Sequence, residues 1–155
     1  VMLATPADLE DFAMGFSLTE GIVASAAEVY GMEVVASCDG LTVQLEIASS
    51  RFAALKDRRR SMAGRTGCGL CGTESLGQAV RPVAPLASDA RFGAAAITAA
   101  LQALRGRQRL HEVTGATHAA GWSRADGTLA LLREDVGRHN ALDKLVGALA
   151  QFWRR

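Results

Sequence analysis

A stretch rich in glycine, serine and threonine at residues 61–77 limits the possible fold more than any other feature of the sequence. Because glycine loses more conformational freedom on folding than any other residue, such a stretch does not pack as a regular helix or strand. Long loops inside compact domains usually carry function. We therefore predict a mobile loop here, and its glycines are Gly64, Gly67, Gly69, Gly72 and Gly77.

The composition is that of one compact domain over residues 1–155, since 49% of the 155 residues are hydrophobic. The formal net charge of +1 and the aromatic content of 5% disfavour a nucleic-acid-binding protein, which usually has a basic excess and stacking residues. Neither a bilayer-spanning apolar run nor a secretory signal occurs in the sequence. We expect a cytoplasmic protein with no membrane partner.

Helical and strand periodicities alternate along the chain, which predicts an α/β or α+β fold built in layers. Thr5 is the expected cap of the first helix, and Ser88 with Asp89 the expected cap of a later one. We predict helices over 6–20, 51–60, 89–105 and 141–149, with strand pairs at 32–36 and 41–47 and at 117–123 and 128–133, joined by turns at 39–40 and 124–127.

Cys68 and Cys71, two residues apart, are the strongest chemical signal. Such a pair can bind a metal, cycle between dithiol and disulfide, or carry sulfur on one thiolate while the other relays it. Each chemistry needs a thiolate, and free cysteine titrates at roughly pH 8.5. Arg65 and the amides of the flanking glycines would stabilise the anion. The glycines would also let the loop move between a donor and an acceptor, which favours a sulfur carrier.

Other interpretations of the cysteines stay open at this point. Zinc bound by Cys68, Cys71 and His118 is one, a thioredoxin-like redox pair is another, and a plain surface turn is a third. Three cysteines do not make a secreted disulfide framework. Cys38 stands alone beside a turn, and we expect it to be a small packed residue.

The segment 133–140 is dense in charged and polar groups and leads from a predicted strand into the last helix. Helix N-termini at the ends of strands bind anions in many layered folds, and Arg138 and Lys144 would add positive charge. The alternative is a solvated helix start capped by Asp135. For His118, a ligand role and a hydrogen bond to a backbone carbonyl are about equally expected.

Three motifs together resemble the FdhD family in register over most of the chain. They are Arg65–Gly72 around the cysteine pair, Thr114–Ala120 around His118, and Arg133–Lys144. Residues 4–6, 15–16 and 20–21 also look like the early helix of that family. The third motif is highly specific, whereas a cysteine pair alone is not.

The resemblance implies a sulfurtransferase that formate dehydrogenases need for activity. A cysteine desulfurase would pass sulfur to Cys68 and Cys71 as a persulfide, and the sulfur would go to the molybdenum bis-guanine-dinucleotide cofactor, for insertion into the formate dehydrogenase catalytic subunit. Residues expected to hold that cofactor are His118, Arg133, Glu134, Asp135, Arg138, His139, Asn140 and Lys144. No tightly bound metal is expected.

The family fold is a three-layer α/β/α arrangement with a cytidine-deaminase-like mixed sheet, and family members form homodimers. The chain lacks the His-x-Glu and Pro-Cys-x-x-Cys pattern of zinc deaminases, so deamination is not implied. Family members have further segments before Val1 and after Arg155, so we expect a core fragment with a partial cofactor pocket. The rival functions are a small zinc-binding interaction module and a non-catalytic scaffold between desulfurase and dehydrogenase.

Overall fold

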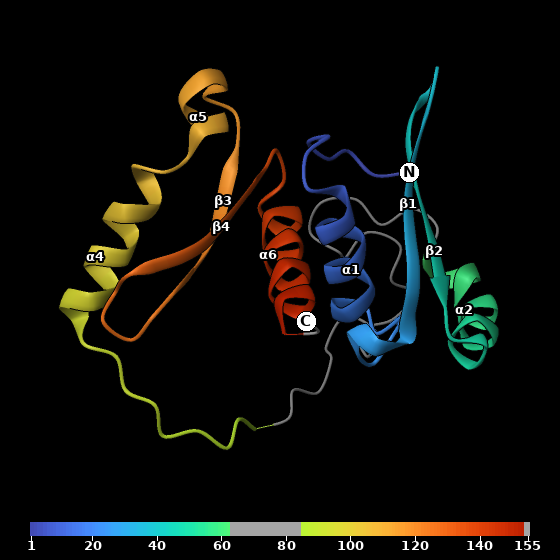
Figure 1. The fold of residues 1–155 in the computed structure, drawn as a ribbon, viewed down its shortest axis with the longest axis horizontal. Coiled ribbons are helices and arrows are strands. Elements are labelled where there is room, and N and C mark those ends of the chain that lie inside the picture. Colours follow the sequence, from blue (N-terminus) through green and yellow to red (C-terminus); the bar gives the residue numbers. More distant parts are fainter. Residues whose placement is uncertain (63–84, 154–155) are drawn as a thin grey trace.

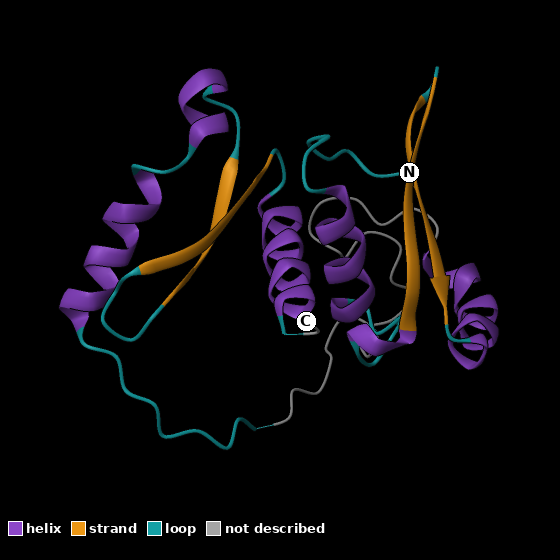
Figure 2. Ribbon diagram, in the orientation of Figure 1, coloured by secondary structure: helices purple, strands orange, loops and turns teal. Residues whose placement is uncertain are grey.

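The computed structural model describes residues 1–62 and 85–153 and confirms the mixed α/β class (Figures 1 and 2). The first part contains α1 (Leu9–Thr19), the short 3-10 helix η1 (Ala26–Glu28), β1 (Val29–Ser37), β2 (Gly40–Ile47) and α2 (Ser49–Met62). The second part contains α4 (Ala94–Arg105), α5 (Arg109–Thr114), β3 (His118–Ser123), β4 (Leu129–Asp135) and α6 (Arg138–Phe152).

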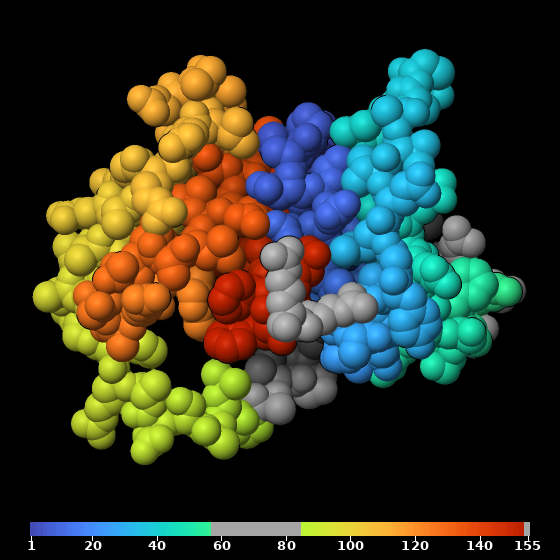
Figure 3. Space-filling model, in the orientation of Figure 1, coloured from blue at the N-terminus to red at the C-terminus, as the bar shows by residue number. Residues whose placement is uncertain are grey.

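Helices α1 and α6 pack against each other at the centre of the molecule. The β3–β4 hairpin lies on the α6 side, and α4 contacts the same hairpin from outside (Figure 1). The β1–β2 hairpin lies on the α1 side, with α2 beyond it. The first and last helices of the sequence therefore lie side by side, as the contact between blue and red residues in Figure 3 shows.

The sheet topology differs from the expected single mixed sheet. Among the described residues, β1 pairs only with β2 and β3 only with β4, both antiparallel. Each pair is joined by a tight turn, and the α1–α6 pair separates the two hairpins. Within residues 1–62 and 85–153, the strand pairs are therefore local antiparallel hairpins. The cytidine-deaminase-like three-layer arrangement, the single domain over 1–155 and the mobile loop at 61–77 stay predictions.

Both predicted hairpins are confirmed, although the first turn lies one residue earlier than the predicted 39–40. Ser37 pairs with Gly40, so Cys38 and Asp39 form the first turn. In the second turn the Asp126 carboxylate accepts the Thr128 N–H at 2.8 Å. Cys38 is exposed, so the expectation of a packed cysteine is wrong: a two-residue turn at the hairpin tip has nothing to pack against.

Two helix starts were predicted wrongly. Helix α1 begins at Leu9, after Asp8, whose φ of 53° lies in the left-handed region, and Thr5 does not cap it. Helix α4 begins at Ala94, because the Ser88 hydroxyl instead accepts the Ala90 N–H in a local turn.

The apolar faces of two helices are less buried than their periodicity predicted. Ile97 and Leu101 on α4 are exposed, as is Phe92 just before that helix, and on α6 Leu142 is exposed. Leu104 of α4 reaches the hairpin, where its Cδ1 lies over Gly121. One two-stranded hairpin is too narrow to cover a whole helix face. None of the described helices has the length and apolar character needed to cross a membrane.

The core depends on a close antiparallel crossing of α1 and α6. Met14, Val23 and Val29 form a buried cluster between α1 and the β1–β2 hairpin. On the other face of α1, Gly15 lies against the backbone of Asp143, and Gly147 of α6 lies against the backbone of Asp11. A Cβ atom at either glycine would overlap a backbone carbonyl, so only glycine permits this separation of the helices.

Gly147→Ala should therefore lower the free energy of unfolding by about 2 kcal/mol or more, because the helices must move apart to admit the methyl group. Chemical denaturation followed by circular dichroism would measure this. Gly93→Ala is the matched control: its backbone is unstrained and a Cβ there meets nothing within 4 Å. Equal effects of the two substitutions would contradict the crossing as a packing constraint.

Candidate functional site

The eight residues predicted from the sequence to hold a cofactor gather around the end of β4 and the start of α6. The structure divides them by exposure. Glu134, Asp135, Asn140 and Lys144 are buried, Arg133 is half-buried, and His118, Arg138 and His139 are exposed. Residues that are adjacent on β4 have different surroundings, because successive side chains of a strand point to opposite faces of the sheet.

Asp135 and Lys144 form an ion pair at 2.7 Å, and both side chains are 0% exposed. The Asp135 carboxylate also accepts the Gly137 N–H at 2.8 Å and the Asn140 side-chain amide at 3.0 Å. Burial alone would raise the pKa of Asp135. The Lys144 ammonium and the N–H donors outweigh burial, so the pKa lies below its usual value. Asp135 is therefore a carboxylate that organises the turn between β4 and α6.

Thr5, from the far end of the chain, completes this cluster with three backbone and side-chain bonds. Its N–H donates to Asp135 at 2.9 Å, and its hydroxyl accepts the Val136 N–H at 3.0 Å. Its carbonyl accepts from Lys144 Nζ at 2.9 Å. Sequence reasoning assigned Thr5 to the wrong structure, a helix cap. Thr5 does lie within residues 4–6, which resemble the early helix of the family. That resemblance was the one feature of the sequence that pointed to a role for Thr5.

Glu134 points the other way and fixes α5 to the hairpin. Its carboxylate accepts the backbone N–H groups of Leu110 at 3.0 Å and His111 at 2.9 Å, and the Thr117 hydroxyl at 3.1 Å. It thereby satisfies the free N–H groups at the start of α5. Thr117 was not among the predicted residues, although it stands within the second motif.

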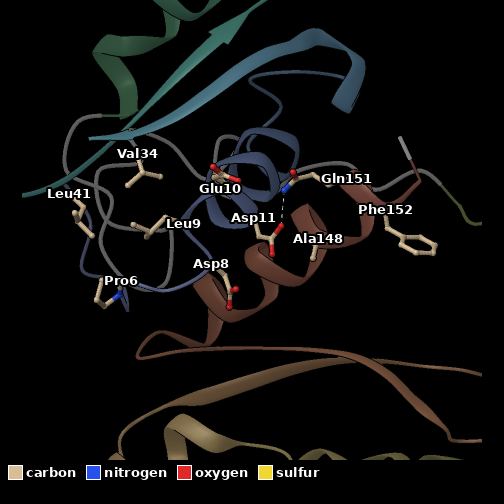
Figure 4. Close-up of a pocket in the computed structure, with 10 residues that line it drawn as sticks. All are labelled: Pro6, Asp8, Leu9, Glu10, Asp11, Val34, Leu41, Ala148, Gln151 and Phe152. Atoms are coloured by element: carbon tan, nitrogen blue, oxygen red, sulfur yellow. Dashed lines mark hydrogen bonds between the residues drawn. The ribbon is translucent and has the colours of Figure 1, made fainter. Parts of the chain in front are cut away.

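Arg133 links the hairpin to α1. Its guanidinium lies 2.6 Å from the Asp11 carboxylate and 3.7 Å from Asp8. Asp11 also accepts the Gln151 side-chain amide at 2.7 Å, shown as a dashed line in Figure 4. Arg133 is thus already paired with internal carboxylates, a role that the sequence did not reveal.

The exposed residues share one end of the β3–β4 hairpin. His118 stands opposite Asp135 in the β3–β4 ladder, and Arg138 and His139 open α6 after Gly137. Gly137 precedes the helix without a side-chain cap, so the first turn of α6 is not closed by a carboxylate as that of α5 is. An uncapped helix start next to a guanidinium and imidazoles favours an anionic group.

Asp143 continues the same surface one turn further along α6. Its carboxylate accepts the Thr19 hydroxyl at 2.8 Å. Burial raises its pKa and the nearby Glu20 adds to this, while Thr19 and His139 act in the opposite direction. Asp143 thus holds a proton more readily than an ordinary aspartate.

A cleft of 610 Å³ lies elsewhere, between the start of α1 and the β1–β2 hairpin (Figure 4). The side chains of Asp8, Glu10 and Asp11 line it beside apolar residues of the hairpin, including Val34 and Leu41. The carboxylates would repel phosphate groups. An anionic ligand is therefore better accommodated at Arg138 and His139 than in this cleft.

The cysteine pair predictions fall on residues outside the described ranges. Cys68, Cys71 and Arg65 all lie between residues 62 and 85. Within residues 1–62 and 85–153, no group of three or more histidine, cysteine or acidic side chains could hold a metal ion. The sulfur-carrier assignment and the zinc site with His118 both stay predictions.

The family model described as the FdhD/NarQ family matches residues 1–152. Over 150 residues the chain is 67% identical to the sulfur carrier protein FdhD of Cupriavidus necator and 60% identical to that of Bordetella bronchiseptica. These alignments cover 97% of this chain and 52% and 54% of the relatives, respectively.

The same fold occurs in a formate dehydrogenase accessory protein from Desulfotalea psychrophila, whose crystal structure aligns with a TM-score of 0.58 at 24% identity. That alignment covers 95% of this chain and 48% of the solved chain. This chain belongs to the FdhD/NarQ family, and it spans about half the length of the curated relatives it matches.

Asp135→Ala should destabilise the fold by about 3–5 kcal/mol, because it leaves the Lys144 ammonium buried without a counter-charge. The double variant Asp135→Leu, Lys144→Met should lose less stability than Asp135→Leu alone or Lys144→Met alone. Denaturant titrations of the three proteins would measure the coupling. Arg51→Met is the control, since its ion pair with Glu28 is partly exposed and should matter little.

The pH dependence of unfolding gives an independent check on the same pair. The pKa of Asp135 is lower in the folded state than in the unfolded state, where it is about 4. The Asp135 carboxylate therefore contributes fully to the free energy of unfolding above about pH 4, and this contribution is lost as the pH falls through the pKa of the folded state. In the Asp135 variants, the free energy of unfolding should fall less steeply with decreasing pH than in the wild type. An unchanged dependence would contradict a carboxylate role.

Proposed function

We propose that the chain is the core of a sulfurtransferase that takes persulfide sulfur from a cysteine desulfurase. It would deliver the sulfur to the molybdenum bis-guanine-dinucleotide cofactor required by formate dehydrogenase. The observation that carries the proposal is the family match over residues 1–152, which includes the Cys68–Cys71 pair, together with 67% identity to a protein named as a sulfur carrier. We place the protein in the cytoplasm, where its partners would work, and expect a homodimer.

The sulfur-loading step needs a thiolate but no external oxidant. The Cys68 thiolate attacks the terminal sulfur of the persulfide on the desulfurase. A new S–S bond forms on Cys68 while the S–S bond of the donor breaks, and the donor cysteine leaves as a thiolate. Cys71 then relays the sulfur or serves as the second acceptor. Arg65 and the glycine amides of the loop would stabilise the charged sulfur.

The acceptor is a substrate with a guanine nucleotide at each end, so its phosphates need donors. His118, Arg138 and His139 are exposed and stand at one end of the hairpin, where they can reach such a ligand. Glu134, Asp135, Asn140 and Lys144 have internal partners, and we assign them to positioning the β4–α6 turn rather than to direct contact. Arg133 has a similar positioning role through Asp11.

Sulfur loading is tested by incubating the protein with a desulfurase and cysteine and measuring its intact mass. The wild type should gain sulfur, and Cys68→Ala should abolish the gain. Cys38→Ala is the matched control, because Cys38 is an exposed thiol in a hairpin turn. Retention of added sulfur in Cys68→Ala would move the carrier role to Cys71. Sulfur gain in the variant lacking both cysteines would overturn the proposal and move the carrier role to Cys38. Activation of formate dehydrogenase by that double variant without sulfur gain would favour a scaffold.

Nucleotide binding is tested by titrating guanosine diphosphate into the protein and following the heat of binding. Arg138→Gln should weaken binding by roughly tenfold, because a charge-assisted bond to phosphate contributes about 1.5–3 kcal/mol. Arg91→Gln is the control, since Arg91 is exposed and lies before α4. Unchanged affinity in Arg138→Gln would remove the start of α6 from the cofactor site. Finding near one zinc per chain in the same protein would instead favour the zinc module.

A further inference from the structure

Three arginines project from the connection between α4 and α5. Arg105, Arg107 and Arg109 are all exposed and alternate with Gly106 and Gln108. We call them the arginine cluster. Arg107 and Arg109 line a hollow of 320 Å³ together with Gly106, Leu131 and Leu132. The cluster lies at the outer side of the β3–β4 hairpin, away from α1 (Figure 1).

The positive charge of the cluster is not neutralised within the part of the chain that the structure describes. There, Arg51 and Arg133 have carboxylates within ion-pair distance, whereas the three cluster arginines have none. Glu134 on β4 is buried, and its carboxylate already accepts from the start of α5. The three guanidinium groups of the cluster therefore have no counter-charge among residues 1–62 and 85–153.

The backbone beneath the cluster is held in consecutive turns. Gly106 N–H donates to Gln102, Arg107 N–H to Leu104, and Arg109 N–H to the Arg107 carbonyl. The side chain of Arg107 is also fixed, since its guanidinium donates to the Leu129 carbonyl at 2.7 Å. A preorganised set of donors loses less conformational entropy when it binds a ligand.

We propose that the arginine cluster docks an acidic segment of a protein partner. Guanidinium groups bind carboxylates through paired hydrogen bonds, and three of them in five residues match a run of carboxylates better than a single small anion. Leu131 and Leu132 in the hollow would contact the aliphatic part of such a side chain. The net charge of +1 for the whole chain disfavours nucleic acid as the occupant.

The arginine cluster lies near the exposed end of the β3–β4 hairpin, so a docked partner would also lie near that end. Leu132 of the hollow directly precedes Arg133 on β4. Resting on the proposed function, we assign the partner as the formate dehydrogenase catalytic subunit, which receives the product. The docking itself does not require that function.

The test is fluorescence anisotropy with a labelled polyglutamate peptide and with a single-stranded oligodeoxynucleotide of equal charge. The full chain should bind the peptide more tightly at low salt than at physiological salt. Arg105→Glu, Arg109→Glu should weaken peptide binding roughly tenfold, because charge complementarity is reversed. This pair leaves Arg107 and its bond to Leu129 in place, and circular dichroism melting checks the fold. Arg91→Glu, Arg124→Glu is the control of equal charge change.

Several results would overturn the proposal. Equal losses in the cluster and control variants would show that only net charge matters. Tighter binding of the oligonucleotide than of the peptide would assign the cluster to nucleic acid. The cluster variant should also accept sulfur from the desulfurase normally while losing affinity for the dehydrogenase. Loss of sulfur loading would show that the cluster serves the donor, whereas failure of loading in the wild type would count against the proposed function alone.

Discussion

The buried ion pair between Asp135 and Lys144 is the interaction on which the arrangement of β4, α6 and the N-terminal segment depends. Two fully buried charges are costly to remove from water unless every remaining donor and acceptor is satisfied. Here the main chain of Thr5 and the amide of Asn140 supply those partners. A charged pair of this kind specifies one geometry, because any displacement leaves a buried charge without its counter-charge.

Three adjacent charged residues of β4, including Asp135 of that pair, contact three different helices. Arg133 binds α1, Glu134 holds α5, and Asp135 binds α6. The turn that follows leaves Arg138 and His139 exposed at a helix start. The dense polar motif therefore has two roles. Its buried residues hold the β4–α6 turn in one conformation, and its exposed residues are positioned by that turn for contact with a ligand.

Much of this could be predicted from the sequence, and the failures have physical causes. Period-2 alternation and turn residues located both hairpins, because these signals are local. Thr5 was misassigned because a threonine before proline predicts a helix cap, whereas its actual partners lie more than 100 residues away. Likewise, no local pattern distinguishes the buried Lys144 from the exposed Arg138: only the packing of α6 on α1 and β4 decides which charge is enclosed.

The bond between Thr5 and Asp135 spans 130 residues, and that between Thr5 and Lys144 spans 139. During synthesis, Thr5 is made 130 residues before Asp135 and 139 residues before Lys144. Helices α1 and α6 can therefore pack together only after nearly all of this sequence has been made. Until then, the face of α1 that packs against α6 has no partner. Contacts of such long range slow folding and expose apolar surface to chaperones in the meantime.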